Sequence, residues 1–184
     1  IGTAYALLEA GLIKAKEGKL VQQCGAGLVT LTVSESSHIS FELPKPKITP
    51  LDAMHTEKLA EILKCEINTQ WNAALVDVGA RWIVLQAVNA GAVLDSQPDF
   101  AALKEHDLEM KVTGATVFGF HENNDEQKHI EVRSFAPSCG INEDPVCGSG
   151  NGSVASFIRY YGILPAQNDV VVSSQGSAVG RDGQ

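Results

Sequence analysis

The segment Phe135–Ser153, FAPSCGINEDPVCGSGNGS, combines two adjacent carboxylates, two thiols, three hydroxyls and four glycines. Carboxylates and thiolates can take a proton from an activated carbon atom and so act as general bases. Hydroxyl and backbone N–H groups can hold an anion beside them. These residue types and their spacing therefore predict proton transfer on a small anionic molecule. The carboxylates are Glu143 and Asp144, and the thiol nearest the glycines is Cys147.

The glycines of this segment precede a predicted amphipathic helix, Ser153–Tyr161. Its apolar residues recur at intervals of three and four, and Gly162 ends it. Backbone N–H groups at a helix start have no partner within the helix and carry partial positive charge, so they attract anions. Glycines let a ligand approach the backbone closely. The predicted anion-binding residues are Gly148, Ser149, Gly150 and Asn151.

Two phosphate-binding motifs do not match these glycines. The pattern is G-x-G-x-G, with Ser153 where a dinucleotide-binding motif has its third glycine. Twelve residues also separate Phe135 from Gly148, in place of a tight turn between strand and helix. No GK[ST] sequence follows, which excludes a P-loop.

The catalytic candidates are Asp144, Cys147 and Ser149, and each also has a structural interpretation. Cys147 stands one residue before a glycine at the helix start, where a thiolate is favoured, yet it could be a small packed residue. Asp144 could accept backbone N–H bonds in a turn, and Ser149 could cap the helix. Glu143 is expected to be solvated or to support the site. Arg133 could pair with a nearby carboxylate.

Charge and composition disfavour several kinds of partner. The chain has 14 Lys and Arg residues against 22 Asp and Glu residues, without a basic stripe, which disfavours nucleic acid and anionic membranes. No apolar run reaches the roughly 18 residues that cross a bilayer, and no secretory signal opens the chain, so we expect a cytoplasmic protein. The cysteines form no CxxC pair, which predicts reduced thiols and no metal site.

The elements that position these residues follow from hydrophobic periodicity. Thr3–Ile13 is apolar on nearly every face and predicts a buried helix. Apolar or alternating runs predict strands near residues 20–23, 28–33 and 39–43, and later near 73–78, 81–88, 115–121 and 129–135. Leu51–Cys65 and Pro98–Leu108 predict two further helices. This mixture of elements indicates an α+β fold.

Three prolines in Pro44–Pro50 favour an extended interdomain linker. The predicted ranges are 1–44 for the remainder of a first lobe, 45–50 for the linker, 51–174 for a second lobe and 175–184 for a return strand toward the first lobe. The two apolar helices also align at an offset of 150 residues, with Gly2-Thr3-Ala4 over Gly152-Ser153-Val154. This repeat predicts two similar lobes with a ligand site between them.

A set of short motifs runs in order along most of the chain: Arg133-x-Phe135-x-Pro137, Gly140-Ile141-x-Glu143-Asp144-Pro145, Gly148-Ser149, Gln175-Gly176 and Gly180-Arg181. Together they resemble the phenazine-biosynthesis isomerase family, which has a diaminopimelate-epimerase-like fold, and the EDP-x-x-GS block is specific. The resemblance implies two pseudo-symmetric lobes, each a mixed β-sheet wrapped around a central helix, and a possible homodimer.

The same resemblance implies a cofactor-independent isomerase that moves a proton on a small carboxylate-bearing metabolite by acid/base catalysis in an interlobe cleft. By motif match, Asp144 and Ser149 fall on the family's site residues, and Gly148 with Ser149 offers N–H groups to a substrate carboxylate. The family's main acid/base glutamate lies upstream of a Gly-His-Pro-Thr motif, and neither occurs in this sequence. We therefore expect a fragment with an incomplete first lobe that is inactive by itself.

Cys147 departs from that family, which usually has threonine at this position. Cys147-Gly148-Ser149-Gly150 instead resembles the second catalytic cysteine motif of diaminopimelate epimerases and proline racemases. A cysteine-based amino-acid racemase or epimerase is therefore one alternative function. A non-catalytic metabolite-binding protein of the same fold is another.

Overall fold

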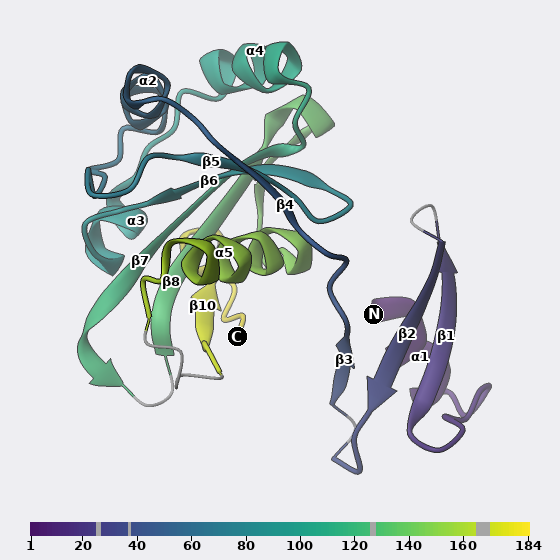
Figure 1. Ribbon diagram of the computed structural model, residues 1–184. Coiled ribbons are helices and arrows are strands. Elements are labelled where there is room, and N and C mark those ends of the chain that lie inside the picture. Colours follow the sequence, from purple (N-terminus) through teal and green to yellow (C-terminus); the bar gives the residue numbers. More distant parts are fainter. Residues whose placement is uncertain (25–26, 37, 126–127, 165–169) are drawn as a thin grey trace. The chain divides into compact units, whose positions relative to one another are not determined.

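The structure is a computed structural model that describes residues 1–24, 27–36, 38–125, 128–164 and 170–184 (Figure 1). The chain forms two compact units, Ile1–Pro44 and Lys45–Gln184, each with its own β-sheet. Among the described residues, no helix combines the length and the apolar character needed to cross a bilayer.

In the unit Ile1–Pro44, helix α1 (Gly2–Glu9) precedes a three-stranded antiparallel sheet in the order β1-β2-β3. The strands are β1 (Lys19–Cys24), β2 (Gly27–Val33) and β3 (Ile39–Phe41). The helix is shorter than the predicted Thr3–Ile13, and Gly11 follows it in a left-handed conformation with φ 67°. Burial on every face is a wrong prediction: Ala4 is the buried residue of α1 and Tyr5 is exposed, because one small sheet can cover only one side of a helix.

The unit Lys45–Gln184 is built on a mixed seven-stranded sheet in the order β10-β8-β7-β6-β5-β4, with β9 paired to β8 beside this path. Strands β6 and β7 run parallel, as do β8 and β10, and the other pairs are antiparallel. The strands are β4 (Lys47–Pro50), β5 (Ala74–Asp77), β6 (Arg81–Gln86), β7 (Gly114–Asp125), β8 (Lys128–Ala136), β9 (Ile141–Asp144) and β10 (Ser173–Gln175).

Two expected ranges differ from this arrangement. Residues 47–50, expected in the linker, form the edge strand β4, where Pro50 is tolerated because an edge strand does not need every N–H group for pairing. Residues 175–184, expected to return to the first lobe, belong to the unit Lys45–Gln184. Hydrogen bonding keeps them there, since β10 runs parallel to β8 and Gln175 pairs with Gly183.

The helices of this unit are α2 (Ala53–Leu63), α3 (Ala90–Asp95), α4 (Phe100–Met110) and α5 (Gly148–Tyr161), with short 3-10 turns η1 (Pro137–Cys139) and η2 (Ser177–Val179). The predictions of α2 and α4 are confirmed, and the side chains of Asp52 and Asp99 cap them. Helix α3 was not predicted, because six residues are too few to show a helical period. Helix α5 begins at Gly148, before the predicted Ser153.

The two faces of this sheet carry different helices. On one face, side chains of β6, β7 and β8 join residues of α2 and α4 in a buried cluster that includes Leu59, Leu63, Ile83, Leu85, Leu103, Val117 and Phe135. On the other face, Phe118 meets Phe157 of α5 with 5.7 Å between ring centroids. Successive side chains of a strand point to opposite faces of the sheet, so the same strands contribute to both layers. Helix α5 thus lies against β5, β6 and β7 and confirms a mixed sheet with a central helix for this unit (Figure 1).

Candidate functional site

The predicted reactive segment forms the connection between β8 and α5. After η1, Gly140 turns the chain with a left-handed φ of 82°. Strand β9 then runs back along β8, so that Asp144 lies opposite Ser134. Helix α5 begins four residues after the end of β9. The residues Asp144–Asn151, which we call the site loop, therefore stand at the junction of a strand end and a helix start.

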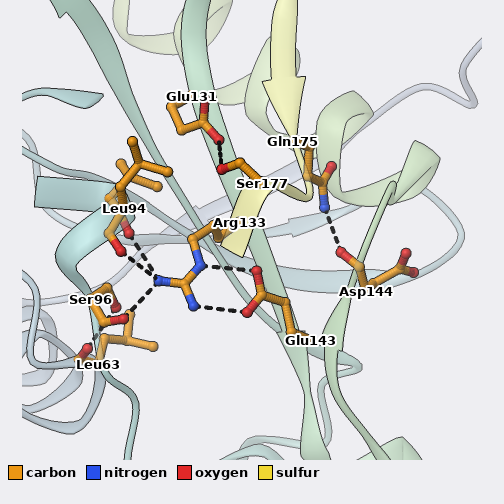
Figure 2. Close-up of polar contacts among 10 residues, drawn as sticks. Leu63, Leu94, Ser96, Glu131, Arg133, Glu143, Asp144, Gln175 and Ser177 are labelled. Carbon is orange, nitrogen blue, oxygen red and sulfur yellow. Dashed lines mark hydrogen bonds and ion pairs between the residues drawn. The ribbon is translucent and has the colours of Figure 1, made fainter. Parts of the chain in front are cut away.

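The two adjacent carboxylates have different surroundings. Glu143 accepts two hydrogen bonds from Arg133, from Nε at 2.9 Å and from Nη2 at 2.8 Å, and both side chains are buried. Nη1 of Arg133 donates to the carbonyl oxygens of Val93, Leu94 and Ser96 at the end of α3 (Figure 2). Glu143 therefore ties β9 to the body of the unit, and both of its carboxylate oxygens are engaged by Arg133.

Asp144 points away from the Arg133 and Glu143 pair (Figure 2). Its Oδ1 accepts a hydrogen bond from the backbone N–H of Val146 at 3.0 Å, as aspartate often does in turns. The side chain is half-buried, and its carboxylate lies close enough to the thiol of Cys147 to influence its ionisation. Asp144 is therefore the accessible carboxylate of the pair, and it has the chemistry needed for proton transfer.

Cys147 occupies the cap position of α5, where its Sγ accepts the N–H of Gly150 at 3.3 Å. The side chain is buried, with 5% of its surface exposed. Burial raises the pKa of the Cys147 thiol, and the Asp144 carboxylate raises it further, against the opposing effects of the Gly150 N–H and the Ser149 hydroxyl. This direction is opposite to the thiolate expected at the helix start, because the loss of hydration outweighs the hydrogen bonds from the Gly150 N–H and the Ser149 hydroxyl.

Ser149 does not cap the helix but receives a hydrogen bond from Trp82. The indole Nε1 of Trp82 lies 3.0 Å from Ser149 Oγ, and Trp82 is almost fully buried in β6. An indole N–H can only donate, so Ser149 Oγ must accept and its own proton is available to another acceptor. Cys147 Sγ lies 3.7 Å away on one side. Trp82 falls in the strand predicted near residues 81–88, but its contact with Ser149 was not foreseen. The general need of a buried indole N–H for a partner was the available signal.

The four predicted anion-binding residues are not equivalent. The N–H of Gly150 is bonded to Cys147 Sγ, and the N–H of Asn151 donates to Cys147 O at 3.0 Å. The N–H groups of Gly148 and Ser149 precede the first hydrogen bonds of α5 and have no acceptor among the described residues. Gly148 is exposed, and a Cβ added there would meet no atom of the described part of the chain within 4 Å. The open N–H groups are those of Gly148 and Ser149.

The side chain of Asn151 is used to hold the site loop. Its Nδ2 donates to Cys147 O at 2.9 Å and to Gln175 Oε1 at 2.8 Å. Gln175 belongs to one of the motifs noted in the sequence, but its contacts with the site loop were not foreseen. Among the described residues, no group of three or more His, Cys, Asp or Glu side chains is arranged to hold a metal ion.

Comparison with curated proteins finds two clear relatives in Schizosaccharomyces pombe. Antisense-enhancing sequence 1 is 35% identical over 188 residues, which cover 98% of this chain and 62% of that protein. An uncharacterized isomerase is 32% identical over 147 residues, which cover 77% of this chain and 78% of that protein. The chain therefore spans less than two thirds of the length of the first of these relatives.

Solved structures show the same fold. A phenazine biosynthesis protein of the PhzF family from Bacillus anthracis matches with a TM-score of 0.79 at 21% identity, covering 100% of this chain and 63% of that chain. A predicted epimerase from Pseudomonas aeruginosa matches with a TM-score of 0.68 at 17% identity, covering 99% of this chain and 62% of that one. These likenesses confirm the predicted α+β, diaminopimelate-epimerase-like fold. Since the family model described as phenazine biosynthesis-like protein matches residues 1–184, the chain belongs to that family.

Proposed function

We propose that the protein is an isomerase that moves a proton on a small carboxylate-bearing metabolite by acid/base catalysis, without a cofactor. The observation that carries the proposal is the composition of the site loop, which presents the Asp144 carboxylate, the Ser149 hydroxyl and the open N–H groups of Gly148 and Ser149. Membership of the phenazine biosynthesis-like family and a relative named an isomerase support the same class of reaction.

In this proposal, the substrate carboxylate accepts hydrogen bonds from the N–H groups of Gly148 and Ser149 and from the Ser149 hydroxyl. The start of α5 adds its partial positive charge, which favours an anion at that position. Charge that develops on the substrate when a C–H bond beside the carboxylate, or in an allylic position, loses its proton is stabilised by the same donors. Asp144 takes up that proton and returns it to another carbon atom.

Cys147 has a secondary part in this proposal. A buried thiol with a raised pKa is uncharged near neutral pH, so it is a poor proton acceptor. As an uncharged neighbour it can donate a hydrogen bond to the Asp144 carboxylate and keep that carboxylate oriented. This role separates the proposed isomerase from a cysteine-based racemase, in which the thiolate itself abstracts the proton. The predicted homodimer and cytoplasmic location stay predictions.

Deuterium incorporation tests the proposal. The intact protein is incubated in D2O with a panel of small carboxylates, and wash-in at carbon is followed by NMR or mass spectrometry. We expect wash-in for at least one carboxylate. Asp144→Asn should lower the rate by about 10²- to 10⁴-fold, the range of one general acid/base group. Ser149→Ala should weaken substrate binding. Asp95→Asn, an exposed carboxylate on α3, serves as the matched control and should leave the rate unchanged.

Other outcomes would assign the alternatives. Loss of wash-in in Cys147→Ser, with normal rates in Asp144→Asn, would favour the cysteine-based racemase. Binding of a carboxylate without wash-in, in wild type and in all variants, would favour a metabolite-binding protein.

A further inference from the structure

The side chain of Gln175 makes three hydrogen bonds to the site loop. Its Oε1 accepts from the backbone N–H of Cys147 at 3.1 Å and from Asn151 Nδ2 at 2.8 Å. Its Nε2 donates to the carbonyl oxygen of Asp144 at 2.9 Å (Figure 2). The amide orientation follows from its partners, because the reverse orientation would place the NH₂ group against two donors. Gln175 is 3% exposed, so water cannot easily replace these bonds.

The backbone of Gln175 is itself held on two sides. As the last residue of β10, it pairs in parallel with Val132 of β8. It also exchanges two backbone hydrogen bonds with Gly183, at 3.0 and 2.9 Å. Because the backbone of Gln175 is hydrogen-bonded on both sides, its side chain begins at a fixed position in the sheet. The side-chain hydrogen bonds of Gln175 therefore hold the site loop at a fixed position relative to the sheet.

Two glycines of the same C-terminal segment let the chain approach the site loop closely. Gly176 has a left-handed φ of 96°, and a Cβ added there would meet the carbonyl oxygen of Pro145 at 2.5 Å. A Cβ added to Gly183 would meet Cγ2 of Val146 at 2.4 Å. Residues 175–183 therefore contact the site loop at consecutive positions, from the Asp144 carbonyl to the Cys147 N–H.

We propose that Gln175 is a positioning residue for the reaction, which fixes the Asp144 backbone relative to the open N–H groups of Gly148 and Ser149. This inference rests on the proposed function, since it concerns the geometry of the same loop. Gln175 bonds to both ends of the turn that separates the carboxylate from the helix start. Proton transfer and anion binding must occur on one substrate, and a displacement of about 1 Å between such groups can cost on the order of 100-fold in rate.

The test compares Gln175→Met with Gln86→Met in the intact protein. Both changes replace a buried glutamine by an apolar side chain of similar length. Gln86 is 6% exposed on β6, and its Oε1 has no hydrogen-bond partner among the described residues, so it is a matched control. Hydrogen–deuterium exchange of the Cys147 amide reports on the site loop, and exchange of β7 amides reports on the stability of the whole unit. The kcat and KM of deuterium wash-in report on the reaction.

In Gln175→Met, we expect the Cys147 amide to exchange at least about 10-fold faster, because it loses its buried acceptor. The β7 amides should change as they do in Gln86→Met. The kcat of wash-in should fall about 10- to 100-fold, with a smaller change in KM.

An unchanged Cys147 amide would overturn the inference. Faster exchange at Cys147 with an unchanged kcat would show that Gln175 holds the loop but does not position the reacting groups, which also overturns it. If the wild type shows no wash-in with any carboxylate, the proposed function fails, and with it the catalytic role of Gln175. The exchange of the Cys147 amide would then still decide whether Gln175 holds the loop.

Discussion

The indole nitrogen of Trp82, in the middle of the sheet, donates a hydrogen bond to the hydroxyl oxygen of Ser149 at a distance of 3.0 Å. The two residues are 67 positions apart in the sequence. Because the indole can only donate, this contact directs the Ser149 proton away from Trp82. The hydroxyl is thus prepared to donate to an anion at the start of α5.

We predict that Trp82 affects substrate binding through Ser149. Trp82→Phe keeps the aromatic ring and removes the donor, so it should raise KM about 3- to 10-fold, the value of one hydrogen bond. A double-mutant cycle with Ser149→Ala checks whether Trp82 acts on KM through its hydrogen bond to Ser149. Trp82→Phe should have no further effect on KM when Ser149 is already alanine. Additive effects of the two substitutions would show that Trp82 acts by packing instead.

Glu143 should matter for stability more than for proton transfer. Glu143→Gln leaves the buried Arg133 guanidinium without its counter-charge, and we expect the free energy of unfolding to fall by about 3 kcal/mol. Urea unfolding measures this change. Glu57→Gln, at an exposed position on α2, is the control and should change the free energy by less than about 0.5 kcal/mol. Equal effects of the two variants would contradict the role of the ion pair.

The thiol of Cys147 should react slowly with iodoacetamide at neutral pH. Burial raises its pKa above the ordinary cysteine value, so the reactive thiolate is scarce at pH 7 and its fraction increases only as the pH rises above about 8.5. The exposed Cys139 provides an internal reference and should be labelled faster at every pH. Mass spectrometry of labelled peptides measures both rates. Faster labelling of Cys147 than of Cys139 at pH 7 would instead support a catalytic thiolate.

Gly150 and Gly148 should respond differently to alanine. A Cβ on Gly150 would lie 2.6 Å from Ser134 Oγ and 3.1 Å from both Cys147 Sγ and Thr116 Oγ1. The atomic shifts needed to accommodate this Cβ should lower the free energy of unfolding by about 1–3 kcal/mol and disturb the Cys147 cap of α5. Gly148→Ala meets open space and should be neutral or slightly stabilising. Thermal unfolding of the two variants checks the prediction, and similar losses in both would contradict it.

Asp107 should destabilise the protein as the pH rises. Its carboxyl group is fully buried in α4, and neither oxygen has a hydrogen-bond partner among the described residues. His106 Nδ1 lies 3.8 Å from Asp107 Oδ1. Burial raises the pKa of Asp107 in the folded state, so the folded protein retains a proton that the unfolded chain releases. The free energy of unfolding should therefore fall as the pH rises above about 4, the unfolded pKa, until the folded pKa is passed.

Asp107→Asn removes this ionisation and should raise the free energy of unfolding at pH 7 by about 1 kcal/mol or more. The advantage over the wild type should shrink as the pH falls through about 4 and disappear below about pH 3, where the wild-type carboxyl is neutral in both states. Urea unfolding at several pH values measures the difference, with the exposed Asp95→Asn as the control. A stability advantage that is constant from pH 4 to pH 7 would show that ionisation of Asp107 is not its source.

The sequence by itself determined the fold class, the family and the segment that carries the candidate site. Local signals were sufficient for these. The EDP-x-x-GS block and the motifs around it are contiguous in sequence, and the cap residues Asp52 and Asp99 stand beside the helices that they begin. The start of α5 could be predicted only to within a few residues. Its first turn is rich in glycine, which has a low helix propensity, so this turn does not look helical in the sequence.

Only the tertiary structure decided which of these residues is available for chemistry. Adjacent carboxylates look alike in sequence, but Glu143 meets a buried arginine and Asp144 does not. The start of a helix favours ionisation of a thiol, yet the packing around Cys147 removes its hydration and raises its pKa. Trp82 and Gln175 reach the site loop from distant strands. Desolvation and hydrogen bonding depend on which groups the fold places around a residue. Sequence spacing does not show which residues from distant parts of the chain become its neighbours.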